Sequence, residues 1–190
     1  MITSPARRIA LALALALPAA GLAEDVPVPY SLQAELLLMI AGHDHNLPAR
    51  AGGEVRTLVL AKPGDEAARA VTQFKAAAAG KATVAGLPHA VEVADFTTGP
   101  ALAGLCKAKH VSIVYLTPGF TSSDASGIAK ALEGESVLTA SAAPAIVKSG
   151  IVLGFDLVAG RAKLLVDLTQ AAKQHVAFGT DVLSLMAVSK

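Results

Sequence analysis

The residues Val111-Ser112-Ile113-Val114-Tyr115-Leu116 (VSIVYL) give the clearest strand signal in the chain. The run is short, rich in β-branched residues, and followed by Thr117-Pro118-Gly119, which favours a turn. It is mostly apolar in both phases of the strand alternation, which is typical of a strand covered on both faces of a parallel sheet. This run therefore predicts one strand of a largely parallel sheet.

The same signal recurs on either side of this run. Three further short apolar runs predict strands, at residues 55–60, 90–93 and 136–139. Amphipathic segments between them predict helices, at residues 65–80, 100–107 and 122–132. Alternation of strands and helices is typical of an α/β fold with a parallel sheet between helical layers.

The two ends of the chain extend this pattern. An apolar segment predicts a first helix over residues 31–42, and Pro48 with Gly52-Gly53 indicates a loop after it. Residues 151–158 and 161–167 flank Ala159-Gly160, which predicts an antiparallel hairpin. Helices are expected near residues 168–175 and 180–188. The predicted fold is a three-layer α/β domain with a mostly parallel sheet of about five to six strands, helices on both faces and a C-terminal antiparallel hairpin.

The first 23 residues have the features of a secretory signal peptide. Arg7 and Arg8 precede an unbroken apolar run from Ile9 to Leu17, and small residues follow at positions 21–23. Cleavage is expected before Glu24, which leaves one α/β domain over residues 24–190 and predicts a periplasmic protein. The alternative is an uncleaved N-terminal anchor.

Composition excludes several classes of partner. Without residues 1–23 the chain carries 14 basic and 15 acidic residues, so it lacks the positive charge that nucleic acids and anionic membranes attract. The single cysteine, Cys106, has no partner for an intramolecular disulfide. It is interpreted as a small buried hydrophobic residue, with an intermolecular disulfide or a reactive thiol as the alternatives.

The segment after the first helix, residues 41–46, reads AGHDHN, in which His43 and His45 flank Asp44. Two helical positions turn the chain through about 200°, so the imidazoles would point apart, and an extended segment would still need a third ligand. The two histidines are therefore weak metal candidates. The alternative is that Asp44 or Asn46 closes the helix end and the histidines are solvated. We predict neither a metal nor a cofactor.

A ligand site is expected where parallel strands end, because ligands of open α/β sheets bind beyond the carboxyl ends of the strands. Those ends carry Lys62, Asp95, Thr117 and Ser141, which offer two opposite charges and two hydroxyls. The alternative is that all four are ordinary turn and cap residues. No Gly-x-Ser-x-Gly elbow and no phosphate loop occurs in the sequence, so no catalytic residue is predicted.

The order of these segments resembles that of the YfiR/HmsC-like family over nearly all of residues 31–188. The resemblance is strongest in residues 151–168, IVLGFDLVAGRAKLLVDL, where a hydrophobic strand, a turn and a second strand ending in Asp-Leu follow the family pattern. It continues in three shorter segments, QAAK at 170–173, SVLTAS at 136–141 and HVSIVYL at 110–116. Asp44, Asn46 and Arg50 are similar to the turn of a divergent subgroup with an Asp-x-Asn-Leu pattern. The chain departs from the family in having no Trp and one cysteine instead of cysteine pairs.

This resemblance implies a non-enzymatic regulator without a cofactor. Such proteins bind the periplasmic sensor part of an inner-membrane receptor, here a diguanylate cyclase or a histidine kinase, and so alter cyclic-di-GMP output, biofilm formation or two-component signalling. A homodimer and a small ligand stay open. Two rival hypotheses are a periplasmic small-solute-binding protein and, less favoured, a metal-dependent enzyme built on the histidines beside Asp44.

Overall fold

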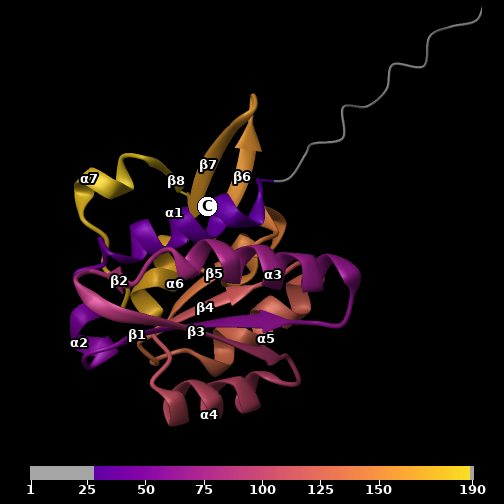
Figure 1. Ribbon diagram of the computed structural model, residues 1–190, viewed down its shortest axis with the longest axis horizontal. Helices are drawn as coiled ribbons and strands as arrows, with labels where there is room; N and C mark the ends of the chain where they lie inside the picture. Colours follow the sequence, from indigo (N-terminus) through magenta and orange to yellow (C-terminus); the bar gives the residue numbers. More distant parts are fainter. Residues whose placement is uncertain (1–27, 189–190) are drawn as a thin grey trace, which may run out of the picture.

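The computed structural model describes residues 28–188, so the expected signal peptide, residues 1–23, lies outside the described residues. One sheet runs through this part of the chain (Figure 1), and its eight strands lie in the order β2-β3-β1-β4-β5-β6-β7-β8. In that order the strands are β2 (Thr83–Val84), β3 (Leu87–Asp95), β1 (Val55–Ala61), β4 (Ile113–Leu116), β5 (Leu138–Ser141), β6 (Leu153–Val158), β7 (Arg161–Val166) and β8 (Met186–Val188).

Helices cover both faces of the sheet. They are α1 (Tyr30–Ala41), α2 (Leu47–Ala51), α3 (Asp65–Ala79), α4 (Gly99–Lys109), α5 (Ser122–Ala131), the 3₁₀ helix η1 (Pro144–Ser149), α6 (Leu168–Lys173) and α7 (Thr180–Leu183). Helices α1 and α3 pack on one face, and α4 and α5 pack on the other (Figure 1). Two apolar cores result, and the sheet separates them. The prediction of an α/β fold with helices on both faces is confirmed.

Most neighbouring strands are parallel. Strands β3, β1, β4, β5 and β6 form a continuous parallel block, because each β–α–β crossover returns the chain in the same direction. Antiparallel pairing occurs between β2 and β3 and between β6 and β7. The predicted hairpin is thus present in the described residues. The strand count is larger than the predicted five to six.

The additional strands are short and lie at the two ends of the sheet. The sequence indicated an extended piece and a turn near residue 83, and this piece pairs with the start of β3 as β2. A helix over residues 180–188 was predicted, and that prediction is wrong, because α7 ends at Leu183 and Met186–Val188 pairs with β7 as β8. The outer edge of β7 offers unpaired backbone groups, and satisfying them outweighs the weak helical pattern of this segment.

The β6–β7 hairpin extends beyond the helical layers (Figure 1). Its turn residues, Ala159 and Gly160, have φ angles of 50° and 74°. Positive φ at both central residues is typical of a type I′ turn, whose twist matches that of the two strands. On its other side β7 pairs with β8 over Leu164–Val166, so only the part of the hairpin nearer its tip lies at the edge of the sheet.

The buried interior includes a hydrogen-bonded glutamine on α1 and a free thiol on α4. The Tyr115 hydroxyl of β4 donates a hydrogen bond of 2.8 Å to Gln33 of α1, and Gln33 donates one of 2.8 Å to the Val28 carbonyl. Gln33 is fully buried, so this chain of bonds satisfies polar atoms that water cannot reach. On the other face, Cys106 of α4 is a free thiol with 4% exposure. Burial raises the pKa of this thiol to about 12, as expected for a buried hydrophobic residue.

Candidate functional site

The Asp44 turn joins the two ends of the described chain. The Asp44 carboxylate accepts hydrogen bonds from the backbone N–H of Asn46 at 3.0 Å and of Ala177 at 2.9 Å, and it pairs with the Arg50 guanidinium. The Asn46 amide donates to the His175 carbonyl at 2.9 Å. The Asp44, Asn46 and Arg50 signature therefore holds the segment after α6 against the end of α1.

The Asp44–Arg50 ion pair is almost fully buried. The side chains of Asp44 and Arg50 are 0% and 4% exposed. Burial lowers the pKa of Arg50, and the neighbouring Asp44 carboxylate opposes that shift. The Nε and Nη1 atoms of Arg50 are buried without a hydrogen-bond partner among the described residues. Removing one member of a pair in this environment leaves the other charge buried and uncompensated, which lowers the free energy of unfolding.

The weak metal candidates lie on either side of that buried carboxylate. His43 and His45 are exposed, whereas Asp44 is 2% exposed and engaged by backbone N–H groups. Within residues 28–188, no three His, Cys, Asp or Glu side chains gather closely enough to hold a metal ion. The C-cap of α1 is Gly42. That Asp44 or Asn46 closes this helix end stays a prediction.

Lys62, at the end of β1, is held by the cap of α5. Its ammonium group lies 2.8 Å from the Asp124 carboxylate and 5.5 Å from the centroid of the Phe120 ring. Asp124 also accepts hydrogen bonds from the Thr121 N–H and hydroxyl, both at 2.7 Å. Burial alone would raise the pKa of Asp124, but the bonds from Lys62 and Thr121 hold that pKa at about 2. Lys62 is thus already paired in the absence of a ligand.

The other three predicted ligand residues have different environments. Thr117 and Ser141 are 1% and 0% exposed; the Thr117 hydroxyl contacts the Pro118 carbonyl, and the Ser141 hydroxyl accepts the Ala143 N–H at 3.0 Å. Asp95 is exposed and lines a cavity of about 240 Å³ beside the N-terminus of α4. The structure does not bring the four side chains around one cavity, and a ligand at these strand ends stays a prediction.

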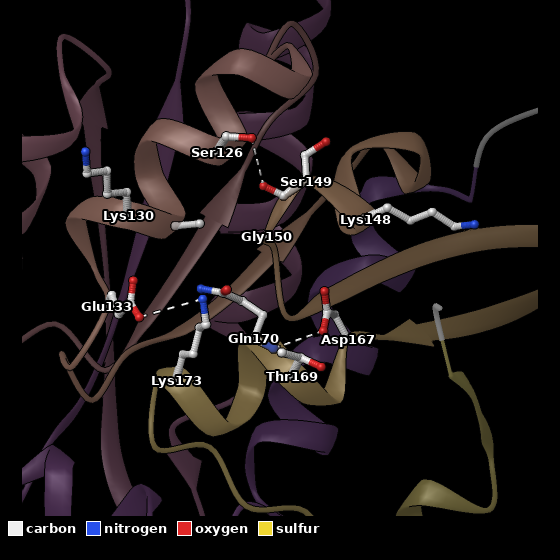
Figure 2. A pocket seen from close by; sticks show the side chains of 11 residues that line it. Ser126, Lys130, Glu133, Lys148, Ser149, Gly150, Asp167, Thr169, Gln170 and Lys173 are labelled. Atoms are coloured by element: carbon white, nitrogen blue, oxygen red, sulfur yellow. Dashed lines mark hydrogen bonds and ion pairs between the residues drawn. The ribbon is translucent and has the colours of Figure 1, made fainter.

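A different pocket lies between the helices on the α5 face. This interhelical pocket has a volume of about 380 Å³ and lies between α5, η1 and α6 (Figure 2). Its lining residues are Ser126, Ala129, Lys130, Glu133, Lys148, Ser149, Gly150, Asp167, Thr169, Gln170 and Lys173. The volume is within the range of small-molecule sites.

Gln170 lies at the base of the interhelical pocket. Its side chain rises from α6 toward α5 (Figure 2), the residue is 6% exposed, and its Nε2 atom has no hydrogen-bond partner among the described residues. The acidic residues around it are engaged: Glu133 lies 3.7 Å from Lys173, and Asp167 accepts the Gln170 N–H at 2.9 Å. The Gln170 Nε2 is therefore a buried donor in the lining of this pocket.

Sequence reasoning missed this pocket for a physical reason. The rule used for parallel sheets looks at strand ends, whereas this pocket is formed where three helical segments meet on one face. The only local signal was Gly150, which lies between η1 and β6. A Cβ at Gly150 would lie 2.5 Å from the Ala129 Cβ, so this glycine lets η1 approach α5 closely.

Exposed apolar side chains gather on α1 and near the C-terminal end of the described chain, and Val93 of β3 and Leu168 of α6 are exposed singly. On α1, Leu32 and Met39 are 37% and 51% exposed and lie seven residues apart, on one stripe of the helix. In the hairpin and C-terminal region the exposed members are Val158, Leu185 and Val188. No helix of residues 28–188 is both long and apolar enough to cross a membrane.

Comparison with known families identifies the chain. The model of the YfiR/HmsC-like family matches residues 30–186, from the first residue of α1 into β8. The chain belongs to the YfiR/HmsC-like family. This family consists of periplasmic regulatory proteins without enzymatic activity. A search of curated proteins found no match.

Solved structures with the same fold are distant in sequence. An ABC domain in complex with L-Trp from Streptococcus pneumoniae has 13% identity and a TM-score of 0.60, with 84% of this chain and 61% of that chain covered. A conserved domain protein from Vibrio cholerae O1 biovar El Tor has 16% identity and a TM-score of 0.58, with 87% and 61% covered. The YfiR/HmsC-like chain spans less than two thirds of either protein, and at this identity the likeness shows the fold alone.

Proposed function

We propose that this YfiR/HmsC-like protein is an exported regulator that binds the periplasmic sensor part of an inner-membrane receptor. The receptor is a diguanylate cyclase or a histidine kinase, and binding lowers or redirects its signal. The family match over residues 30–186 carries the proposal. The physical basis is a population shift, in which a partner that binds one receptor state more tightly biases the receptor toward that state.

The exposed stripe of α1 supports this proposal. One side of α1 is buried, with Ala34, Leu37 and Ile40 at no more than 1% exposure. Leu32 and Met39 lie on the other side and belong to neither core cluster. Burial of such apolar surface in a contact with a receptor would contribute about 25 cal/mol per Å² to binding. The β6–β7 hairpin, with Val158 near its tip, is a second candidate contact.

Photocrosslinking in living cells tests the proposal. A photoreactive residue at Met39 is expected to capture a membrane protein that carries a periplasmic sensor part, and the same residue at Lys75 on α3 is the control. Deletion of the protein is expected to change cellular cyclic-di-GMP or the phosphorylation of a response regulator. The absence of any captured receptor from α1 and hairpin positions, together with unchanged signalling, would contradict the proposal.

A charged α1 stripe gives the matched genetic test. Leu32→Glu with Met39→Glu is expected to abolish complementation of the deletion, because two carboxylates would be desolvated in the interface. Val93→Glu on β3 is the control, since Val93 is an apolar residue of similar exposure, 41%. If both variants complement fully while remaining folded and exported, α1 is not the receptor-binding surface.

A small-solute-binding role is the second candidate function. The interhelical pocket favours it, because a volume of about 380 Å³ with an unpartnered buried amide is suited to a small polar ligand.

A further inference from the structure

We infer that the interhelical pocket binds a small organic anion through a carboxylate group, which accepts a hydrogen bond from the Gln170 side-chain amide. The inference gives the second candidate function a site and a ligand class, and it does not depend on the membrane receptor.

The buried amide is the primary observation. Gln170 is 6% exposed, and its Nε2 donor has no partner among the described residues. Leaving a buried donor unsatisfied costs about 1–3 kcal/mol, so a ligand that accepts this hydrogen bond recovers that energy. The Gln170 Oε1 atom lies 3.7 Å from where a Gly150 Cβ would be, on the η1 side of the pocket.

The charges around the pocket favour an anion over a cation. The lining holds three lysines, Lys130, Lys148 and Lys173, and two carboxylates. Glu133 lies 3.7 Å from Lys173, and Asp167 accepts the Gln170 N–H as the N-terminal cap of α6. Lys130 and Lys148 form no ion pair with an acidic residue within residues 28–188. With three lysines and two carboxylates, the lining carries one net positive charge, which favours an anion over a cation.

The two free lysines lie on opposite rims of the pocket. Lys130 belongs to α5 and Lys148 to η1, and both side chains extend outward in the view of Figure 2. A lysine carries its charge on a flexible four-carbon stem, so either ammonium group can fold over the mouth of the pocket. One carboxylate at Gln170 and a second near the rim would use all three donors. A dicarboxylate is thus the best-matched probe.

Isothermal titration calorimetry with succinate tests this inference, with the neutral diamide succinamide as the matched ligand. Succinate is expected to bind saturably and succinamide is not. Gln170→Leu is expected to weaken succinate binding about tenfold or more, as for the loss of a hydrogen bond to a charged group. Lys130→Gln with Lys148→Gln is expected to weaken binding several-fold and to reduce its dependence on salt.

Lys107→Gln is the control, because Lys107 is an exposed lysine of α4 that pairs with Glu135 outside the pocket. Its affinity for succinate is expected to equal that of the unmodified protein. The lysine variants change side chains at the rim of the pocket and are expected to fold. They therefore still test the inference if Gln170→Leu unfolds. No saturable succinate binding, binding of inorganic phosphate alone, or equal affinity in the folded pocket variants overturns the inference. None of these results bears on receptor binding.

Discussion

Asp44 joins two distant parts of the chain with one carboxylate. It accepts N–H groups from Asn46 and from Ala177, 133 residues away, and it neutralises Arg50. Its neighbours His43 and His45 are exposed, so the polar cluster in the sequence is divided between the surface and the interior. At this scale Asp44 has a structural role in the fold.

Replacing Asp44 by alanine is therefore expected to destabilise the protein strongly. Removing one member of a buried ion pair leaves the other charge uncompensated, which typically costs about 3–5 kcal/mol. Urea unfolding followed by circular dichroism measures the change. Asp44→Ala with Arg50→Ala is expected to recover part of the loss, because no unpaired charge then remains buried.

Glu54→Ala provides the control for this experiment. Glu54 pairs with Arg56 at 2.7 Å, but the two side chains are 39% and 38% exposed. A pair accessible to water contributes at most about 1 kcal/mol. Equal losses for Asp44→Ala and Glu54→Ala would show that the Asp44 pair is not the buried anchor that its exposure indicates.

The Asp44 turn also illustrates how far the sequence could be interpreted. The bond from the Asn46 N–H to the Asp44 carboxylate is local, because short polar side chains accept hydrogen bonds from nearby N–H groups. The contacts to Ala177 and His175 could not be predicted from one sequence. The bonded residues are separated by 133 and 129 positions, and no local pattern links such distant residues. These long-range hydrogen bonds determine what Asp44 and Asn46 hold together in the fold.

At the scale of elements, the connection from η1 to β6 depends on Gly150. Its φ is +106°, a region that side chains with a Cβ rarely adopt, and its N–H donates to the Val147 carbonyl at 3.0 Å. The ideal Cβ position lies 2.5 Å from the Ala129 Cβ of α5. Both the turn and the contact between η1 and α5 therefore require glycine here.

Gly150→Ala is expected to reduce the free energy of unfolding by about 2–4 kcal/mol, from backbone strain together with overpacking. Gly160→Ala in the β6–β7 turn is the matched control, because its φ is +74° but nothing lies within 4 Å of its Cβ position. That change is expected to cost about 1 kcal/mol, for the backbone alone. Chemical denaturation measures both, and a smaller loss at Gly150 than at Gly160 would contradict the close approach of η1 to α5.

The elements that the sequence predicted well are those with strong local patterns. VSIVYL became β4 and the run at 55–60 became β1, each within two residues of the expected bounds. The C-terminal segment has no such pattern: its apolar residues fit a helix and a strand almost equally well, and pairing with Leu164–Val166 of β7 selected the strand. The short helix α2 was missed because Pro48 indicated a loop, although proline is favoured in the first turn of a helix.

At the scale of the whole molecule, the sheet separates two cores, and the ends of the described chain contribute to only one of them. The core on the α1 face includes residues from both ends of the described chain, such as Tyr30 and Val182. The core on the α4 face draws on the middle of the chain, including Cys106 and Ile128. Strands β1, β3 and β4 contribute side chains to both cores, so neither core can form without the sheet.

The protein is therefore expected to unfold as one cooperative unit, consistent with the proposed single domain over residues 24–190. Two natural probes report the two cores separately. Tyrosine fluorescence reports the α1 face, since Tyr30 and Tyr115 both belong to that core and the chain contains no Trp. Reaction of a thiol reagent reports the α4 face, since Cys106 is 4% exposed and burial raises its pKa to about 12.

Urea titrations followed by tyrosine fluorescence, Cys106 labelling and circular dichroism are expected to give the same midpoint, because two-state unfolding exposes both cores together. Leu37→Ala on the α1 face is expected to cost about 2–5 kcal/mol and to shift all three midpoints equally, since Leu37 is 0% exposed. Labelling of Cys106 at a lower urea concentration than the loss of the tyrosine signal would show that the α4 face opens independently. The sheet would then connect two separately stable halves.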